Sequence, residues 1–259
     1  MGWGSLWLAR QPEQKVIRRY MALLKLPQAA HDLLSLELSA DQQQAFERYA
    51  HELIAWNEAR VNLTAITDPL AIEMRHFLDS LSVLRAVPLP PNTRVIDVGA
   101  GAGFPGLPLR IVCPTIQLSL LEATGKKITF LEHVAKLLNL NNVKLVNLRA
   151  EEAGQEPAYR EQYDVVLARA VAHLPILAEY LLPLCRVGGR CVALKGESAA
   201  AEIGAAEHAL KLLGGRLAQL TAVELPHVAE THYLIVIEKI AATPPHYPRR
   251  PGIPSKKPL

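Results

Sequence analysis

Apolar side chains in the first third of the chain recur with the spacing of an amphipathic helix, at positions i, i+3, i+4, i+7 and i+8. Ser39 and Gln42 precede this run with the spacing of a capping box, in which each side chain bonds a backbone amide of the other residue. The run therefore predicts a helix that begins near Ser39 and has one apolar face. That face consists of Phe46, Tyr49, Ala50, Leu53 and Ile54.

A second apolar stripe follows Asp68-Pro69, a pair typical of a helix start because proline fits the first helical turn. The prolines at positions 88, 90 and 91 end this stripe and mark a candidate boundary. We therefore expect an N-terminal helical region over residues 1–91. The stripe consists of Leu70, Met74, Phe77, Leu78, Leu81 and Leu84.

After this boundary, short apolar runs alternate with helical stretches such as Lys127–Leu138 and Leu174–Cys185. Strands that alternate with helices require crossover connections, which build a parallel sheet with helices on both faces. The last two runs are joined by a short loop, so the final strand can run antiparallel. We therefore expect an α/β fold over residues 92–240, a Rossmann-like, seven-stranded and mainly parallel sheet. The expected strands are Arg94–Val98, Ile116–Leu121, Val143–Asn147, Asp164–Ala168, Arg190–Leu194, Gln219–Val223 and Tyr233–Glu238.

The remaining residues, 241–259, form a basic and proline-rich tail. Prolines occupy six of the sixteen positions from Pro244 onward, which excludes a helix or a central strand over most of it. The tail contains Arg249, Arg250, Lys256 and Lys257 and no acidic residue, whereas the whole chain has a net charge of only +3. Two interpretations stay open: a solvated, disordered end, or a contact with an anionic partner.

Composition indicates an ordinary globular protein, with 50% hydrophobic and 20% charged residues. The cysteines, Cys113, Cys185 and Cys191, lack CxxC spacing, which excludes a zinc ribbon and a disulfide framework. We expect them to be core thiols, and we expect no bound metal. No targeting signal or membrane-spanning run stands out, so we expect a cytoplasmic protein without membrane contact.

The clearest chemical feature is a glycine-rich turn after the first expected strand. Gly99, Gly101 and Gly103 follow that strand, and Asp97 stands two residues before the first glycine. Glycine allows the backbone to approach a ligand closely, and open α/β sheets bind ligands at this edge. Glu122 ends the second strand, where its carboxylate can accept both hydroxyls of a ribose. The pattern lacks the lysine of a GxxxxGK[ST] loop, which argues against a nucleoside triphosphate site.

Structural alternatives stay open at each of these positions. The glycines can serve a tight turn that has no ligand, Glu122 can be a surface acid, and Asp97 can bond amides of its own loop.

The glycine-rich turn resembles that of class I S-adenosylmethionine-dependent methyltransferases. Its neighbours resemble the 16S ribosomal RNA guanine-N7 methyltransferase family, RsmG or GidB, from about Gln42 to the C-terminus. The order and spacing of the short motifs carry this resemblance. They are Trp56-Asn57, Asn62-Leu63-Thr64-Ala65-Ile66, Arg75-His76-Phe77-Leu78-Asp79-Ser80, Gly103-Phe104-Pro105-Gly106, Arg149-Ala150-Glu151, Arg169-Ala170-Val171-Ala172, Lys195-Gly196 and Tyr247-Pro248-Arg249-Arg250-Pro251-Gly252.

This resemblance implies particular roles for residues of this chain. Gly99 and Phe104 match positions that line the cofactor, Ala150 and Glu151 match the pair that flanks its adenine, and Arg169 matches an arginine of the site. Ala100 departs from the family, because many members carry Ser or Thr there. The first forty residues are not diagnostic.

The resemblance also implies an activity and a partner. The expected reaction transfers methyl from S-adenosylmethionine to N7 of guanine 527 in 16S rRNA. The expected partner is 16S rRNA, the small ribosomal subunit or an assembly intermediate, and the protein is expected to be a monomer.

The residues after the fourth expected strand agree with an N7 target. Arg169-Ala170-Val171-Ala172 stands where enzymes that methylate exocyclic amino groups often carry an Asn/Asp-Pro-Pro-aromatic turn. Guanine N7 has a free lone pair, so positioning it against the methyl group supplies most of the rate. N7 lies deep in the major groove of A-form RNA, which favours a target in a loop.

Several side chains remain candidates for contacts with RNA. The expected phosphate contacts are Lys195, Arg249 and Arg250, with Arg169, Lys256 and Lys257 as further candidates. Each of these can instead be a solvated cation or an ion-pair partner. His76 and Asp79 either touch RNA or, as we prefer, tie their helix to the sheet, and Trp56 is expected in the core. Two rival functions stay open, a small-molecule methyltransferase and a non-catalytic RNA-binding module.

Overall fold

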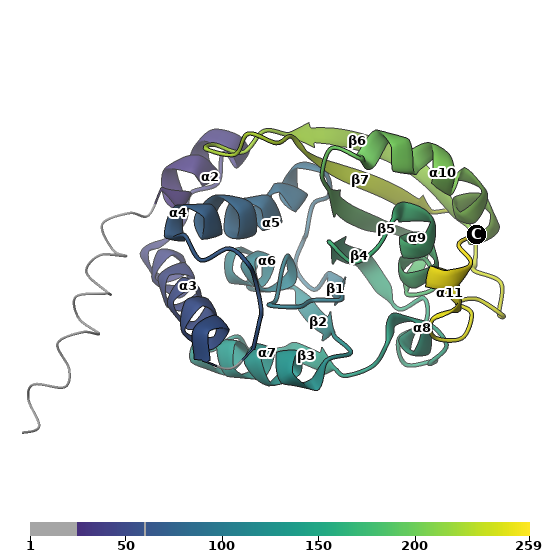
Figure 1. Ribbon diagram of the computed structural model, residues 1–259, viewed down its shortest axis with the longest axis horizontal. Helices are drawn as coiled ribbons and strands as arrows, with labels where there is room; N and C mark the ends of the chain where they lie inside the picture. Colours follow the sequence, from purple (N-terminus) through teal and green to yellow (C-terminus); the bar gives the residue numbers. More distant parts are fainter. Residues whose placement is uncertain (1–24, 60) are drawn as a thin grey trace, which may run out of the picture.

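The computed structural model describes residues 25–59 and 61–259, and the predictions for residues 1–24 lie outside this part. Seven strands form one sheet in the order β3-β2-β1-β4-β5-β7-β6 (Figure 1). The five strands from β3 to β5 are parallel, and β7 runs antiparallel to both of its neighbours, which confirms the expected fold class. The strands are β1 (Arg94–Val98), β2 (Gln117–Leu121), β3 (Val143–Val146), β4 (Tyr163–Arg169), β5 (Cys185–Lys195), β6 (Gly215–Val223) and β7 (His232–Lys239).

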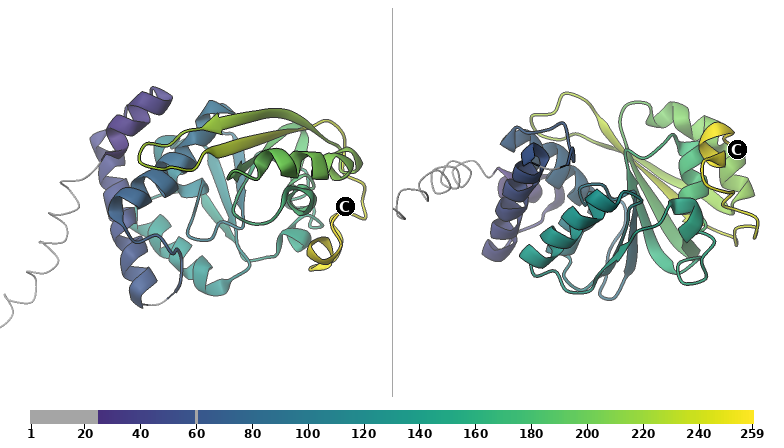
Figure 2. Two further views of the ribbon diagram at one scale, coloured as in Figure 1. Left: turned by 45° about the horizontal axis from the view of Figure 1, so that its top comes forward. Right: turned by 60° about the horizontal axis from the view of Figure 1, so that its bottom comes forward.

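Helices cover both faces of this sheet (Figure 2, right). One face carries the helices before β1 together with α6 and α7, and the other carries α8, α9, α10 and the C-terminal segment, residues 241–259. The helices before β1 are α2 (Leu26–Leu34), α3 (Ala40–Ala59), α4 (Pro69–Ile72), η1 (Glu73–Leu78), α5 (Asp79–Leu81) and η2 (Ser82–Arg85). The others are α6 (Gly106–Val112), α7 (Gly125–Leu137), α8 (Ala150–Ala153), α9 (Leu174–Leu181), α10 (Ala199–Leu212) and α11 (Ile253–Lys256).

The N-terminal helices and the sheet share one hydrophobic core. Phe46 and Tyr49 of α3 are fully buried, and the Tyr49 hydroxyl donates to the carbonyl of Ala102 in the glycine-rich turn. The rings of Tyr49 and Phe104 stack with centroids 5.3 Å apart. Burial of such aromatic surface favours packing of these layers against each other. The helices before residue 91 therefore form a layer of the same core as the sheet.

Local signals in the N-terminal region are confirmed where they concern helix starts. Gln42 Oε1 accepts from the Ser39 amide at 2.9 Å, and Ser39 Oγ accepts from the Gln42 amide at 3.3 Å. Asp68 Oδ1 accepts from the Ala71 amide at 2.9 Å. The second apolar stripe, however, is not one regular helix, because residues Glu73–Leu78 form a π-helix between α4 and α5. The wider turn places successive side chains at angles that a 3.6-residue period does not anticipate.

Two other expectations need adjustment. The helix expected over Leu174–Cys185 is too long, since α9 ends at Leu181 before Pro183, and Cys185 begins β5. Trp56 is half-buried against the core, with its ring centroid 5.4 Å from that of Phe130.

The expected core thiols fit the structure. Cys185 and Cys191 are fully buried, and Cys113 is partly buried against the core. Across residues 25–59 and 61–259, none of the helices combines the length and the apolar character needed to traverse a lipid bilayer.

The interpretation of the tail as a disordered end is wrong. The Arg160 guanidinium donates to the carbonyls of Thr243 (2.8 Å) and Tyr247 (2.7 Å), and Glu161 accepts from the Thr243 amide at 2.8 Å. Tyr247 and Leu259 pack against the core on this face. Proline restricts the backbone, so a proline-rich segment loses less conformational entropy when it becomes ordered. These few polar contacts therefore suffice to hold the segment in place.

Glu73 joins the π-helix to α2, and its titration supplies a prediction. Its Oε2 accepts from the amides of Lys25 (2.6 Å) and Leu26 (2.8 Å), and burial raises its pKa from 4.5 to about 7. Because the folded-state pKa lies above the unfolded one, this group stabilises the fold fully below pH 4.5, and that contribution is lost as pH rises through 7.

We therefore expect the free-energy difference between wild type and Glu73→Gln to change with pH, because the variant lacks this titration. Wild type should lose on the order of 2 kcal/mol relative to the variant between pH 4.5 and 8. Urea unfolding of both proteins across this range measures the difference. A difference that stays constant with pH contradicts the buried carboxyl.

Candidate functional site

The carboxyl ends of β1 and β2 bring the glycine-rich turn and its two acids together. Asp97 is fully buried; its Oδ2 accepts from the Gly106 amide at 2.8 Å, while Oδ1 has no hydrogen-bond partner among the described residues. Burial, opposed in part by the Gly106 bond, raises the pKa of Asp97 from 3.8 to about 7. Asp97 therefore does bond an amide of its own loop, and its second oxygen is buried without a hydrogen-bond partner among the described residues.

The turn itself requires glycine for its backbone conformation. Gly99 and Gly101 have φ values of +69° and +59°, a region that residues with a Cβ rarely adopt. The Gly101 amide donates to Glu122 Oε2 at 3.0 Å, and Glu122 Oε1 accepts from the Thr124 amide at 2.8 Å. Glu122 is only 6% exposed, so its interpretation as a surface acid is wrong. A Cβ on Gly101 would meet nothing closer than the Gly99 carbonyl at 3.8 Å, so the space beside this amide is open.

The next strand along the edge, β3, leads into α8, which contains the predicted adenine pair. Ala150 is half-buried, and Glu151 is buried with its Oε1 accepting from the Gly252 amide at 3.0 Å. Asn147 at the end of β3 donates to the Glu122 carbonyl at 2.9 Å. Glu122 and the start of α8 are therefore neighbours on one edge of the sheet.

Phe104 lies on the other side of the turn, between the N-terminal helices and the sheet. It is 5% exposed, and its ring stacks on that of His76 with centroids 4.6 Å apart. The Arg169 guanidinium lies over the Phe104 ring at 4.9 Å. The turn is thus supported by side chains from η1 and β4, and the predicted cofactor contact of Phe104 stays a prediction.

Arg169, the last residue of β4, connects the sheet to η1 and α5. Its guanidinium donates to the Arg75 carbonyl at 2.8 Å, to Asp79 Oδ2 at 3.1 Å and to His76 Nδ1 at 3.1 Å. Burial, reinforced by the Arg169 charge, lowers the pKa of His76 from 6.5 to about 3, so the imidazole is neutral. A neutral ring that accepts at Nδ1 carries its proton at Nε2, which lies 2.8 Å from Thr64 Oγ1.

These contacts agree with the preferred interpretation of His76 and Asp79. Both are at most 8% exposed, and both hold the N-terminal helices against the end of β4. Asp79 Oδ1 also lies 2.7 Å from His232 Nδ1.

A pocket of about 380 Å³ opens beside this network, between η1 and the ends of β4 and β5. Lys195 lies in it, with Nζ 2.6 Å from Glu202 Oε2 and 2.5 Å from the Ala172 carbonyl, so its predicted role in binding RNA stays a prediction. Sequence reasoning missed Glu202 and His232, since neither lies in a local pattern and each is brought to the pocket by a separate element. The lining includes Arg75, His76, Asp79, Arg169, Lys195, Glu202 and His232.

The predicted phosphate contact of Arg249 is not supported. Its guanidinium donates from Nε (2.9 Å) and NH2 (2.6 Å) to the two oxygens of Glu179, a fully buried carboxylate on α9. A bidentate pair of this kind occupies the donors that a phosphate would use. Arg250 is exposed, so its predicted contact stays a prediction.

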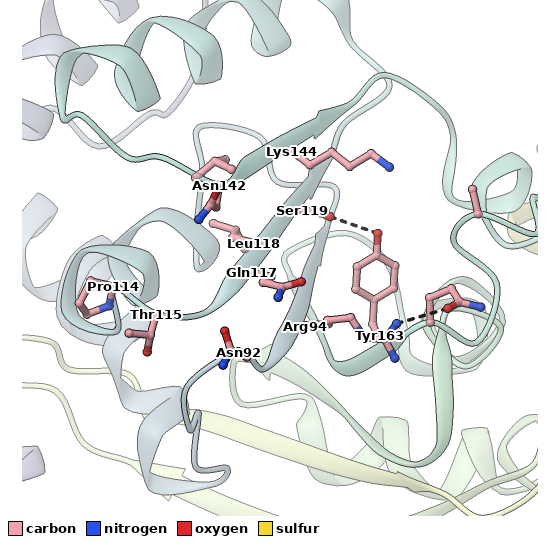
Figure 3. Close-up of a pocket in the computed structure, with 13 residues that line it drawn as sticks. Asn92, Arg94, Pro114, Thr115, Gln117, Leu118, Ser119, Asn142, Lys144 and Tyr163 are labelled. Carbon is pink, nitrogen blue, oxygen red and sulfur yellow. Dashed lines mark hydrogen bonds between the residues drawn. The ribbon is translucent and has the colours of Figure 1, made fainter.

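A larger hollow of about 920 Å³ lies at the opposite edge, at the amino ends of β1, β2 and β3. Figure 3 shows its polar lining, in which the Tyr163 hydroxyl donates to Ser119 Oγ at 3.1 Å. None of the predicted site residues lines it. Over residues 25–59 and 61–259, no cluster of three or more His, Cys, Asp or Glu side chains is arranged to hold a metal ion.

The Arg169 network leads to a stability prediction. Asp79→Ala leaves the largely buried guanidinium of Arg169 without its carboxylate, so we expect a loss of about 2–4 kcal/mol in the free energy of unfolding. Glu230→Ala is the matched control, because Glu230 pairs with Arg75 in an exposed position and its loss should hardly change stability. Urea unfolding compares them, and equal losses would contradict the proposed importance of Asp79.

The sequence of this chain also matches known proteins. Residues 42–231 match the family model GidB, described as rRNA small subunit methyltransferase G. The "Ribosomal RNA small subunit methyltransferase G" of Roseiflexus castenholzii is 50% identical over 224 residues, 86% of this chain and 94% of that protein. The protein of the same name from Desulforamulus reducens is 41% identical over 236 residues, 91% of this chain and 98% of that protein.

Solved structures share the fold at low identity. The crystal structure of TrmN from Thermus thermophilus has a TM-score of 0.51 and 21% identity, covering 65% of this chain and 53% of that one. A SAM-dependent O-methyltransferase from Thermotoga maritima has a TM-score of 0.50 and 17% identity, covering 74% of this chain and 72% of that one. The family match, which spans the glycine-rich turn, Glu122, α8 and Arg169, goes further than the fold: the chain is a member of the rRNA small subunit methyltransferase G family.

Proposed function

We propose that this protein transfers the methyl group of S-adenosylmethionine to N7 of a guanine in 16S rRNA, the guanine that the resemblance places at position 527. The observation that carries the proposal is membership of the family together with the arrangement at the sheet edge. The family match covers residues 42–231, and this range includes every buried acid at the ends of β1, β2 and β3.

The residues at this edge fit the cofactor. Asp97 Oδ1 is a buried acceptor that lacks a protein donor, and the space beside the Gly101 amide is open. Neighbouring strands lie about 4.8 Å apart, so an extended ligand that follows the edge from β1 to β3 meets Asp97, Glu122 and α8 in turn. Glu122 would accept from the ribose, with the base beyond it at Ala150 and Glu151. When bound, the cofactor supplies an electrophilic methyl group on a sulfonium.

The pocket beside Arg169 would receive the guanine. Its volume of about 380 Å³ lies in the range of ordinary ligand pockets. Its lining holds Arg75 and two ion pairs, Arg169 with Asp79 and Lys195 with Glu202. Guanine N7 needs no deprotonation before attack, so the site has to orient the base rather than remove a proton. Neutral His76 accepts from Arg169 and so holds the guanidinium at the wall of the pocket, and the buried thiols of Cys185 and Cys191 are not placed to act as nucleophiles.

The substrate would present this guanine outside a regular helix, because the major groove of A-form RNA is too narrow for side chains to read. Exposed Arg250, Lys256 and Lys257 are suitable phosphate contacts. We propose the small subunit or an assembly intermediate as partner, a monomeric protein and a cytoplasmic location.

Cofactor binding is tested at Glu122. Glu122→Gln keeps an acceptor for the Gly101 amide but loses the charge, so the affinity for S-adenosylhomocysteine should fall about 10- to 100-fold with little change in fold. Isothermal titration calorimetry measures the affinity, and circular dichroism checks the fold. Glu132→Gln, an exposed change on α7, is the control. Equal affinity in the two variants contradicts the ribose assignment.

The reaction is tested with a labelled methyl group and three substrates: naked 16S rRNA, isolated small subunits and assembly intermediates. We expect transfer to at least one of them, and cleavage of the RNA by borohydride and aniline at one guanine, which reports methylation at N7. Transfer to small metabolites alone would favour the small-molecule alternative. Binding of RNA without transfer would favour the non-catalytic module.

A further inference from the structure

The C-terminal segment, residues 241–259, forms hydrogen bonds and an ion pair with α8 and α9. Figure 1 shows this segment beside α8 and α9, far in sequence from both. The Gly252 amide donates to Glu151 Oε1 at 3.0 Å. Three residues earlier, the Arg249 amide donates to Glu179 Oε1 at 2.7 Å, and the Arg249 guanidinium donates to both oxygens of the same carboxylate.

Glu179 is the buried residue that fixes the position of Arg249. It lies on α9 with no exposed surface, whereas the Arg249 side chain is 24% exposed. A carboxylate buried so deeply strongly destabilises the fold when it lacks a partner. Arg249 therefore has to lie against Glu179. The ion pair therefore sets where the following residues, up to Gly252, can lie.

Further contacts prevent the segment from shifting along α8. Gln155 donates to the Pro248 carbonyl at 2.8 Å, and Arg160 donates to the Tyr247 carbonyl at 2.7 Å. A Cβ on Gly154 would lie 2.7 Å from Pro248 Cγ, so the absence of a side chain there allows close packing. The segment is thus fitted to the end of α8 on both sides of Arg249.

Glu151 lies where this placement affects ligand binding. The Gly252 amide occupies Oε1, one of the two carboxylate oxygens of Glu151. Glu151 is the second residue of α8, which follows β3 next to Glu122 along the sheet edge, so the base of a nucleoside with its ribose at Glu122 would extend toward Glu151. A carboxylate oxygen held there is a suitable acceptor for the exocyclic amino group of adenine.

We propose that Arg249 is a positioning residue for the cofactor: its ion pair with Glu179 places the Gly252 amide, which orients the Glu151 carboxylate toward the adenine amino group. This inference rests on the proposed function, because it assumes an adenosyl cofactor along β1, β2 and β3. The two neighbouring arginines then have separate roles. Arg249 supports the cofactor site, and the exposed Arg250 is available for other contacts.

The test compares two neighbouring arginines in the full-length protein. Calorimetry measures affinities for S-adenosylhomocysteine and for S-inosylhomocysteine, which replaces the amino group of the base with an oxygen. Wild type should prefer the adenosyl compound by at least tenfold. Arg249→Ala should weaken its binding about tenfold and reduce this preference severalfold, whereas Arg250→Ala should change neither value.

A second variant guards against unfolding. Arg249→Ala leaves Glu179 buried without a partner, whereas Arg249→Met combined with Glu179→Leu removes both charges together and keeps the volume filled. If this folded double variant keeps wild-type affinity and preference, or if Arg250→Ala loses as much as Arg249→Ala, the inference is wrong. Loss of RNA binding with unchanged cofactor affinity in Arg249→Ala would also overturn it, in favour of a phosphate contact. A wild-type protein that binds neither compound would overturn the proposed cofactor site as well.

Discussion

The arrangement of the site depends on the hydrogen bonds and the ion pair of the Arg169 guanidinium. It ends β4 beneath the π-helix, and it finds a carboxylate in Asp79, an acceptor in His76 and a carbonyl in Arg75. A largely buried cation is tolerated only with such a complete set of partners, so the N-terminal helices have one favourable position against the sheet. Because the same residues line the pocket, those helices act as a wall of the site rather than as an independent appendage.

Near this cation, the acids at the sheet edge bond the backbone amides of the glycine-rich turn and its neighbours. Glu122 holds the amides of Gly101 and Thr124, and Asp97 holds that of Gly106. Each carboxylate therefore helps to hold the backbone of the glycine-rich turn in place. The pKa of Asp97 is raised because the acid is buried and only one of its oxygens has a hydrogen-bond donor. A ligand that donates a hydrogen bond to the other oxygen would lower this pKa.

The C-terminal segment shows how composition and position carry different information. Its cations suggest an anionic partner when they are read along the chain, but the fold directs Arg249 inward to Glu179 and leaves Arg250 exposed. Likewise, Lys239 near the start of this segment is fully buried and donates to the carbonyl of Leu182 at 2.7 Å. Net charge therefore overstates the basic surface available to a polyanion.

By itself, the sequence determined the class of fold, the order of helices and strands, and the position of the glycine-rich turn, because hydrophobic periodicity and backbone requirements are local. Arg94–Val98 was predicted to the residue for this reason, and so were the capping box at Ser39 and the acids Asp97 and Glu122 at strand ends. Only the tertiary structure decided that residues 73–78 form a π-helix, that Glu202 and His232 join the pocket, and that Arg249 binds Glu179. Each of these depends on residues distant in sequence, whose contacts are set by packing and by the need to satisfy buried charges, and no local pattern encodes that choice.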